Sequence, residues 1–525
     1  MSKRTVALVL ALLMLLADVI PSVMPGAEAA VSAPASLKPK YGSNGKFIAP
    51  VKPPAKDSVA ISNLAELRKF RSEVGVKNSK YHLTADIDLS GVEWKPPQMH
   101  DGIFDGQGFV IRNLKITKKK GEAGFFEHIS NSTVKNLGFE GTKLSANNAG
   151  AVSSGNVSGS VIDNCYNAGS ISAVVAGGIA VEAVGNSKIS NCYNTGSISA
   201  VVKKGWPQAA GIVVGTHDNA GNVYSGSAKG IAKIINCYNT GTVSALSKGK
   251  IKHTSTNNRG RAAGITLGQF GGGPKVSSCY NAGKILATEA FGISQKAHSI
   301  RSCYNTGAIR GADACGIGNA KEISDCFNTG AISASFSNPS VFTASIALGI
   351  GGARNMKNCY NTGTVSAYAS KGTSASAAGI GEIGITEAFR DCYNTGPVNA
   401  TSKRYAVAGG ISAGGSSMNG KAAELSSCYN AGKVRARAKT SYAGGIMGWN
   451  GMVKIKNCYW SKKSAKKGVG YYYENYKPKK GGAKPLNARK MKKKSSYKGF
   501  DFKKAWVLTK GKNKGFPVLR AFNKK

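Results

Sequence analysis

Cysteines are the first residues in this chain whose type and spacing could do chemistry. Ten of the eleven recur in one motif, at intervals of 27, 45, 42, 24, 23, 33, 33, 36 and 30 residues. No Cys-x-x-Cys pair suggests zinc or a redox dithiol. The shared register predicts one structural position used ten times, filled by buried thiols that behave as small apolar groups. Disulfides between neighbouring repeats are the alternative, although in-register strands would aim the Cβ atoms alongside each other. The ten are Cys165, Cys192, Cys237, Cys279, Cys303, Cys326, Cys359, Cys392, Cys428 and Cys458.

Basic residues are the second group. The chain has 525 residues, with 71 Lys and Arg against 26 Asp and Glu, a net charge of +45. Residues 461–525 hold 22 of these bases against two acids, with tyrosines interleaved. Another 16, against Glu289 and Asp313, fall in loops at one point of the repeat. Because these loops leave equivalent positions, they are expected to line one edge of the fold.

Such segments suit anionic polymers, because counterion release supplies affinity without sequence specificity. Acidic envelope or matrix polysaccharide is the expected partner, and nucleic acid would bind only non-specifically. Simple solubilisation by charge is the alternative. The expected anion-binding residues are Lys203, Lys204, Lys248, Lys250, Lys252, Arg259, Arg261, Lys403, Arg404, Arg435, Arg437, Lys439, Lys477, Lys479, Lys480, Lys492, Lys493 and Lys494.

One acidic pair could do catalysis. Glu289 and Asp313 each lie ten residues after a repeat Cys. In neighbouring short coils they would be roughly 5 Å apart, the separation of a retaining glycosidase. A surface coincidence, neutralised by Lys284 or Arg310, is the competing interpretation. Histidines share no register, so neither a metal nor a cofactor is expected.

The elements that position these residues are short repeated strands. Each Cys is followed by an aromatic residue, and nine of the ten by Asn at the second position and Gly at the fourth. The residue three before each Cys is apolar, and in nine repeats the sixth after is β-branched. No unit can bury these residues alone, so the pattern predicts an all-β parallel β-solenoid of about ten or more coils. The asparagines are expected to take left-handed turn geometry and to stack as hydrogen-bonded amides. The aromatic column could be exposed and stack on polysaccharide, but a packed aromatic ladder is the more common arrangement.

The two ends differ from the repeats. Residues 1–29 have the basic start, apolar run and Ala27-Glu28-Ala29 of a secretory signal peptide, and 30–56 form a linker rich in Pro and Lys. A short helix with Asn63 as N-cap and Glu66 in a capping box is expected to cover one end of the solenoid. The predicted parts are thus 57–150 (N-terminal cap and first coils), 151–460 (repeats) and 461–525 (Lys-rich C-terminal tail and cap).

A family resemblance rests on four stretches. They are residues 82–89 (HLTADIDL), 104–114 (FDGQGFVIRNL), 124–126 (GFF) with 134–137 (VKNL), and the serial Cys-Tyr-Asn-Thr-Gly units. With the closing motifs at 500–506 and 515–519, they resemble the secreted bacterial repeat proteins with GLUG motifs. The resemblance implies a right-handed parallel β-helix on a surface or secreted protein, often adhesin-like. Neither the His-Glu-x-x-His of metallopeptidase relatives nor a Leu-Pro-x-Thr-Gly sorting motif is present.

Together these patterns predict a secreted, non-enzymatic β-solenoid that binds anionic polymers through basic loops and tail. A polysaccharide lyase or glycosidase, and a passive spacer, are the alternatives. No segment is long and apolar enough to suggest a transmembrane helix.

Overall fold

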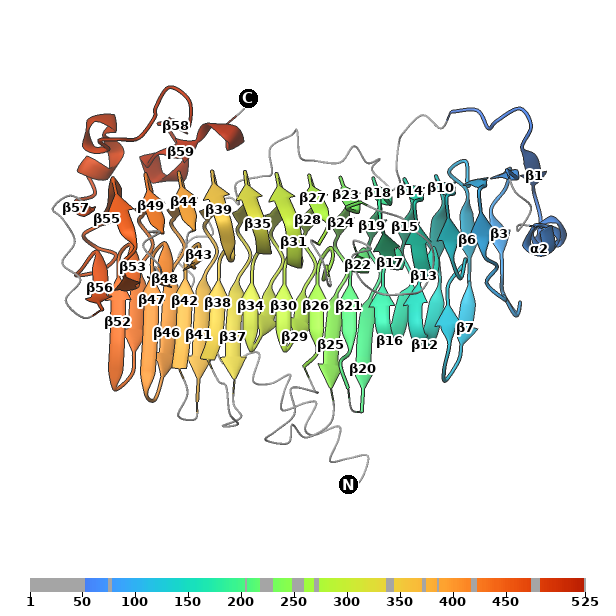
Figure 1. Cartoon of the computed structure of the whole chain (residues 1–525), viewed down its shortest axis with the longest axis horizontal. Helices are drawn as coiled ribbons and strands as arrows, with labels where there is room; N and C mark the ends of the chain where they lie inside the picture. The colour runs from blue at the N-terminus through green and yellow to red at the C-terminus, as the bar shows by residue number, and fades with distance from the viewer. Residues whose placement is uncertain are drawn as a thin grey trace. The chain divides into compact units, whose positions relative to one another are not determined.

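The chain folds into a parallel β-helix. The computed structural model describes residues 52–73, 78–203, 205–217, 230–247, 259–268, 273–336, 344–370, 374–384, 387–416, 423–473 and 482–523. The predicted signal peptide and most of the linker lie outside these residues. A representative coil runs through β31 (Ser294–Arg301), β32 (Tyr304–Asn305), β33 (Ile309–Gly311) and β34 (Asp313–Cys315) before β35 (Gly318–Ser324) opens the next. Within the solenoid, the strands pair in parallel with their equivalents in the neighbouring coils (Figure 1).

Four long ladders and short accessory sheets build the solenoid. The first ladder has fourteen strands, from β1 (Val59–Ile61) to β54 (Lys454–Lys456), and the second has fourteen, from β3 (Ile87–Asp88) to β57 (Ala483–Leu486). A third ladder runs from β7 (Lys115–Thr117) to β51 (Val434–Arg437), and a fourth from β8 (Glu122–Ala123) to β52 (Thr440–Gly444). The long strands β12 (Lys143–Gly150) and β16 (Ser170–Gly177) belong to both ladders, and the two separate at β20 (Ile198–Val202) and β21 (Gln208–Ala210). The coils therefore extend beyond the Cys repeats at both ends.

Alternation along each short strand explains the repeat motif. The Cys and the Asn two residues later point into the core, whereas the aromatic residue between them points outward. All eleven cysteines are free thiols and buried, which confirms the prediction and excludes the disulfide alternative. The inward asparagines form an amide ladder in which each Nδ2 donates to the next Oδ1 at 2.7 to 2.8 Å, from Asn167 to Asn430.

The prediction of left-handed geometry was placed at the wrong residue. The Asn after each aromatic residue lies in a strand, and the residue just before each Cys is left-handed, with φ between 49° and 56°. The reason is that the chain turns between the first and second ladders, immediately ahead of the Cys. Asn, Asp and Ser occupy this position, since a short polar side chain tolerates that backbone. The ten are Asn164, Asn191, Asn236, Ser278, Ser302, Asp325, Asn358, Asp391, Ser427 and Asn457.

The outward aromatic residues stack into a column. Ring centroids from Tyr166 to Tyr429 follow one another at 4.8 to 5.1 Å, and their planes are within 9° of parallel. The rings lie outside the main core, in contrast to the cysteines, yet nearly all of them are buried, so the column is a packed aromatic ladder and not an exposed surface for stacking sugars. The structure thus decides between the two orientations left open by the sequence.

Both ends carry a covering element. Helix α2 (Leu64–Glu73) buries Leu67 and Phe70 against the first coils, and the side chain of Asn63 accepts the backbone N–H of Glu66, as predicted. Glu66 in turn accepts the N–H of Ser62, one residue earlier than the standard capping box requires. At the other end residues 482–523 fold back over the second ladder (Figure 1). Within the described part of the chain, no helix has the length and apolar character to cross a bilayer.

Candidate functional sites: a basic cap and a groove

The C-terminal segment is a folded cap. We define the cap as residues 482–523, which contain β57, the hairpin of β58 (Trp506–Val507) and β59 (Val518–Leu519), and four 3₁₀ turns: η2 (Lys490–Lys492), η3 (Lys494–Ser496), η4 (Asn513–Gly515) and η5 (Arg520–Phe522). Its apolar side chains lie on the aromatic column. Trp506 packs between Tyr393 and Tyr429, at centroid distances of 6.0 and 5.7 Å, and Phe522 packs on Phe327 and Tyr360.

Hydrogen bonds fix the cap to the same column. The hydroxyl of Tyr429 donates to the carbonyl of Pro517 at 2.6 Å, and that of Tyr459 donates to the carbonyl of Lys498 at 2.9 Å. Trp506 Nε1 donates to Asp391 Oδ1 at 2.8 Å. Burial raises the pKa of Tyr429 well above its usual range. Tyr280, which the cap does not cover, is less buried, and burial raises its pKa to about 12.

The outer surface of the cap is strongly basic. Thirteen Lys and Arg residues, all exposed, stand against one acid, Asp501, a net charge of +12 in residues 482–523. Three of the predicted anion-binding residues, Lys492, Lys493 and Lys494, lie here around the buried Met491.

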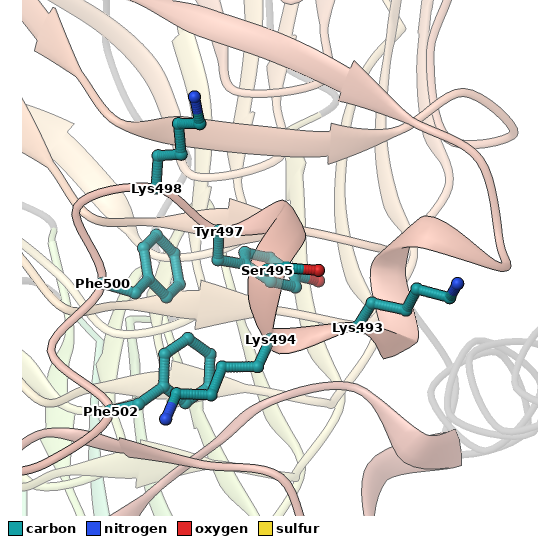
Figure 2. A pocket seen from close by; sticks show the side chains of 7 residues that line it. All are labelled: Lys493, Lys494, Ser495, Tyr497, Lys498, Phe500 and Phe502. Atoms are coloured by element: carbon teal, nitrogen blue, oxygen red, sulfur yellow. The ribbon is translucent and has the colours of Figure 1, made fainter.

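A shallow depression of about 740 Å³ lies beside them, lined by Lys493, Lys494, Lys498 and the aromatic rings of Tyr497, Phe500 and Phe502 (Figure 2). The ammonium of Lys494 sits 5.5 Å from the centre of the Phe502 ring. Cations held beside aromatic faces can bind a sugar acid by charge and by ring contact at once.

The predicted basic edge is present in part. Lys203, Lys403, Arg404 and Lys439 are exposed in the turns that join the third ladder to the fourth, and Arg435 and Arg437 are exposed on β51. The turns stack in register, since the backbone N–H of Lys439 bonds the carbonyl of Lys403 at 3.2 Å. Other predicted members lie outside the described residues: Lys204, Lys248, Lys250, Lys252, Lys477, Lys479 and Lys480.

A groove runs along the fourth ladder, next to this edge. Its outward-facing floor has two parallel columns of residues. One reads Gln208, Arg261, Glu289, Asp313, Ile346, Ser376, Val407 and Tyr442 in strand order. The other reads Ala210, Ala263, Phe291, Cys315, Leu348 and Ala378, and is apolar throughout.

Two adjoining cavities form the groove, with volumes of about 880 and 360 Å³. Glu382 of β43 (Gly381–Ile383) lines both, so they share a wall. The larger is bounded by Trp206 at one end and by Gln295 and Lys296 along its side; the smaller is bounded by Tyr405 and Trp449.

The acidic pair lies at the centre of the larger cavity. Glu289 on β30 (Glu289–Phe291) and Asp313 on β34 are in-register neighbours, so the structure brings together the two residues predicted from spacing. Both oxygens of Glu289 are engaged: Arg259 lies 3.5 Å from Oε1, and Arg261 lies 3.2 Å and Gln295 2.7 Å from Oε2.

Asp313 is in a different electrostatic state. Burial, reinforced by the nearby charge of Glu289, raises its pKa to about 6. Among the described residues no base lies within ion-pairing distance of its carboxylate. Glu382, which accepts the hydroxyl of Ser376 at 2.8 Å, also has a raised pKa because it is buried.

One cluster of possible metal ligands was not predicted from the sequence. Glu122, Glu127 and His128 have ligand atoms within 4.8 Å of one another. However, the backbone N–H of Asn156 donates to His128 Nδ1 at 3.0 Å. The neutral ring then carries its proton on Nε2 and offers no free lone pair, so the arrangement does not fit a metal.

Comparison with known proteins does not assign this chain to a family. No family model matches the chain, and no curated protein matches it. Among solved structures, one described as a putative immunoglobulin A1 protease from Bacteroides ovatus aligns over 89% of this chain and 94% of its own. The sequence identity is 16% and the TM-score 0.22, so the match carries no argument about this chain.

Sequence reasoning missed three parts of these sites. The neutralising bases of Glu289 are Arg259 and Arg261 of the preceding coil, whereas Lys284 and Arg310 were expected. Trp206 and Glu382 were not singled out, because neither shares the repeat register with the acidic pair. A Gly-Ile pair recurs in the repeats, as in Gly211-Ile212 and Gly316-Ile317, and the apolar residue just before it was a signal for the groove floor.

Proposed function

We propose that this chain is an exported, non-enzymatic β-helix that binds anionic envelope or matrix polysaccharide, in an adhesin-like role, through the basic cap and the basic edge. The observation that carries the proposal is the cap itself, with thirteen exposed bases against one acid on a scaffold fixed to the solenoid. A passive spacer would not need such a surface to be held in place by buried aromatic contacts.

Rigid attachment supports binding rather than mere solubility. A disordered basic tail loses conformational freedom when it binds, whereas these bases are already presented on one face by Tyr497, Trp506 and Phe522. The depression beside Phe500 and Phe502 adds aromatic contact to the charge (Figure 2).

A lyase or glycosidase is less well supported. Glycosidic hydrolysis needs one carboxyl as acid and a second free to act as nucleophile or base. Glu289 has both oxygens committed to Arg259, Arg261 and Gln295. Asp313, which has no ion-pair partner among the described residues, is then the remaining carboxyl in the larger cavity beside the engaged Glu382.

The test is cosedimentation of the full chain with insoluble polygalacturonate and with purified cell walls. Neutralising the cap as Lys492→Gln, Lys493→Gln and Lys494→Gln together should weaken binding at least about tenfold, and about 1 M salt should abolish it, because the Debye length falls to about 3 Å. The matched control neutralises three exposed lysines of the solenoid, Lys115, Lys143 and Lys188. Binding that survives 1 M salt, or that both triple variants weaken equally, would refute a cap-centred mechanism.

A further inference from the structure

The groove is a second candidate recognition surface, and it lacks the excess of bases that marks the cap. Its acids, Glu289, Asp313 and Glu382, are balanced by Arg261 and Lys296 in the lining and by Arg259, which pairs with Glu289. One column of its floor and both of its ends are apolar or aromatic. The groove therefore has no surplus of positive charge to attract an anionic polymer. The ligand proposed for the cap therefore does not suit the groove.

The shape of the groove indicates an extended ligand. The strands from β26 (Arg261–Ala263) through β30, β34, β38 (Ala344–Leu348) and β42 (Ser374–Ala378) to β47 (Tyr405–Gly409) contribute to its floor. Six strands at about 4.8 Å spacing make it roughly 24 Å long. A chain molecule lying along the solenoid axis would fill it.

Aromatic residues at the two ends point to sugar rings. Trp206 is 41% exposed, although it is a large apolar side chain, and its indole is held by the guanidinium of Arg261 at 5.1 Å from the ring centre. Tyr405 and Trp449 bound the far end. Such faces stack on the C–H surfaces of pyranose rings, and this observation does not depend on the acidic residues.

The polar groups in the middle complete a hydroxyl-binding set. Gln295 and Arg261 are fixed by Glu289, and Asn319 lines the same cavity. Asp313 faces Glu289, Arg259 and Glu382, and Lys296 is exposed on the facing wall. Amide groups, a guanidinium already paired with Glu289, and the carboxyl of Asp313 suit the vicinal hydroxyls of an uncharged sugar.

We infer that this groove binds an uncharged glycan chain along the solenoid axis, with Trp206 and Trp449 stacking on sugar rings and Asp313 bonding hydroxyl groups between them. This site is distinct from the basic cap. The chain would then hold an anionic polymer and a neutral glycan at the same time.

The test is affinity electrophoresis of the full chain in native gels containing mixed-linkage β-glucan, galactomannan, dextran or chitohexaose. At least one of these probes should retard the protein, and retardation should persist in high salt. Trp206→Ala and Asp313→Asn should each weaken that binding at least about tenfold. The matched controls are Tyr368→Ala, an exposed aromatic residue on the third ladder, and Glu322→Gln, an exposed acid on β35.

Three results would overturn the inference. The first is that none of the four probes retards the protein. The second is that Trp206→Ala binds the glycan as tightly as the unmodified chain does. The third is that new reducing ends appear during incubation, which would make the groove a hydrolytic site. Neutralising Lys492, Lys493 and Lys494 should leave this binding unchanged, so failure here and failure of the cap proposal are separable.

Discussion

The cap and the groove are held in place by different means. The cap joins the second ladder through β57, but beyond that strand it lies on the column of aromatic rings, and its position depends on a few contacts such as those of Trp506 and Tyr429. The groove is part of the coils, and each of its residues is placed by strand register with the coil before and after. The comparison teaches that a repeat can build an extended cavity through register alone, whereas a concentrated charge needs a separate element fixed by side chains.

The largest effect should come from detaching the cap. Trp506 is fully buried, and Trp506→Ala should cost about 3–5 kcal/mol of docking free energy, because a large cavity and an unpartnered Asp391 remain. Limited proteolysis should then cut within residues 482–523 while the solenoid stays intact. Polyanion binding should fall and binding of a neutral glycan should not. Cleavage throughout the chain would show that the cap and the coils fold as one unit.

Neutralising lysines of the cap tests the same difference between cap and groove without detaching the cap. The triple variant of Lys492, Lys493 and Lys494 removes three of thirteen exposed bases from the cap. Titration with dextran sulfate at several salt concentrations should give a weaker affinity and a shallower dependence on salt than the unmodified chain. An unchanged slope would place the polyanion elsewhere on the molecule.

The groove should respond to pH through Asp313. Its pKa is raised from 3.8 to about 6 in the folded chain, so between these values the folded state keeps a proton that the unfolded state has lost. Stability due to this group therefore falls as pH rises across that window. Asp313→Asn removes this loss of folding stability. The variant should therefore melt on the order of 1 to 3 °C higher than the unmodified chain above pH 6.5, and at almost the same temperature below pH 3.5. Glu322→Gln is the exposed control, and an equal gain at all pH values would contradict the account.

The smallest effect concerns the thiols. All eleven are buried, and burial raises the pKa of Cys315 on the groove floor to about 12. A thiol reagent should modify none of them in the native chain at neutral pH and all eleven in denaturant. If one reacts slowly it should be Cys315, which lines the groove, and Cys315→Ala should remove that reaction. Fewer than eleven thiols in denaturant would indicate disulfides.

Much of the fold followed from periodicity. The register of Cys165 to Cys458 predicted the parallel β-helix, the buried thiols and the stacked amides, because each depends on residues repeated at the same position. The left-handed site was misplaced by three residues, since Asn occurs both before and after the Cys and the pattern alone does not say which one turns.

The sites were predicted less completely. Spacing was enough to pair Glu289 with Asp313, because both are counted from a repeat Cys. Trp206, Arg259 and Glu382 come from segments of variable length, so only the folded chain shows that they meet the pair. The same holds for Trp506, which bonds Asp391, and for Phe522, which packs on Phe327, because each of these partners lies more than a hundred residues earlier in the chain.

The most direct test of the account is a two-ligand, two-variant binding experiment. Affinity for dextran sulfate and for the retarding neutral glycan is measured on the unmodified chain, on the triple lysine variant of the cap and on Trp206→Ala. The account predicts a clean separation: the lysine variant loses only the polyanion, and Trp206→Ala loses only the glycan. If either variant weakens both ligands to the same extent, the cap and the groove are not independent sites and the central claim is wrong.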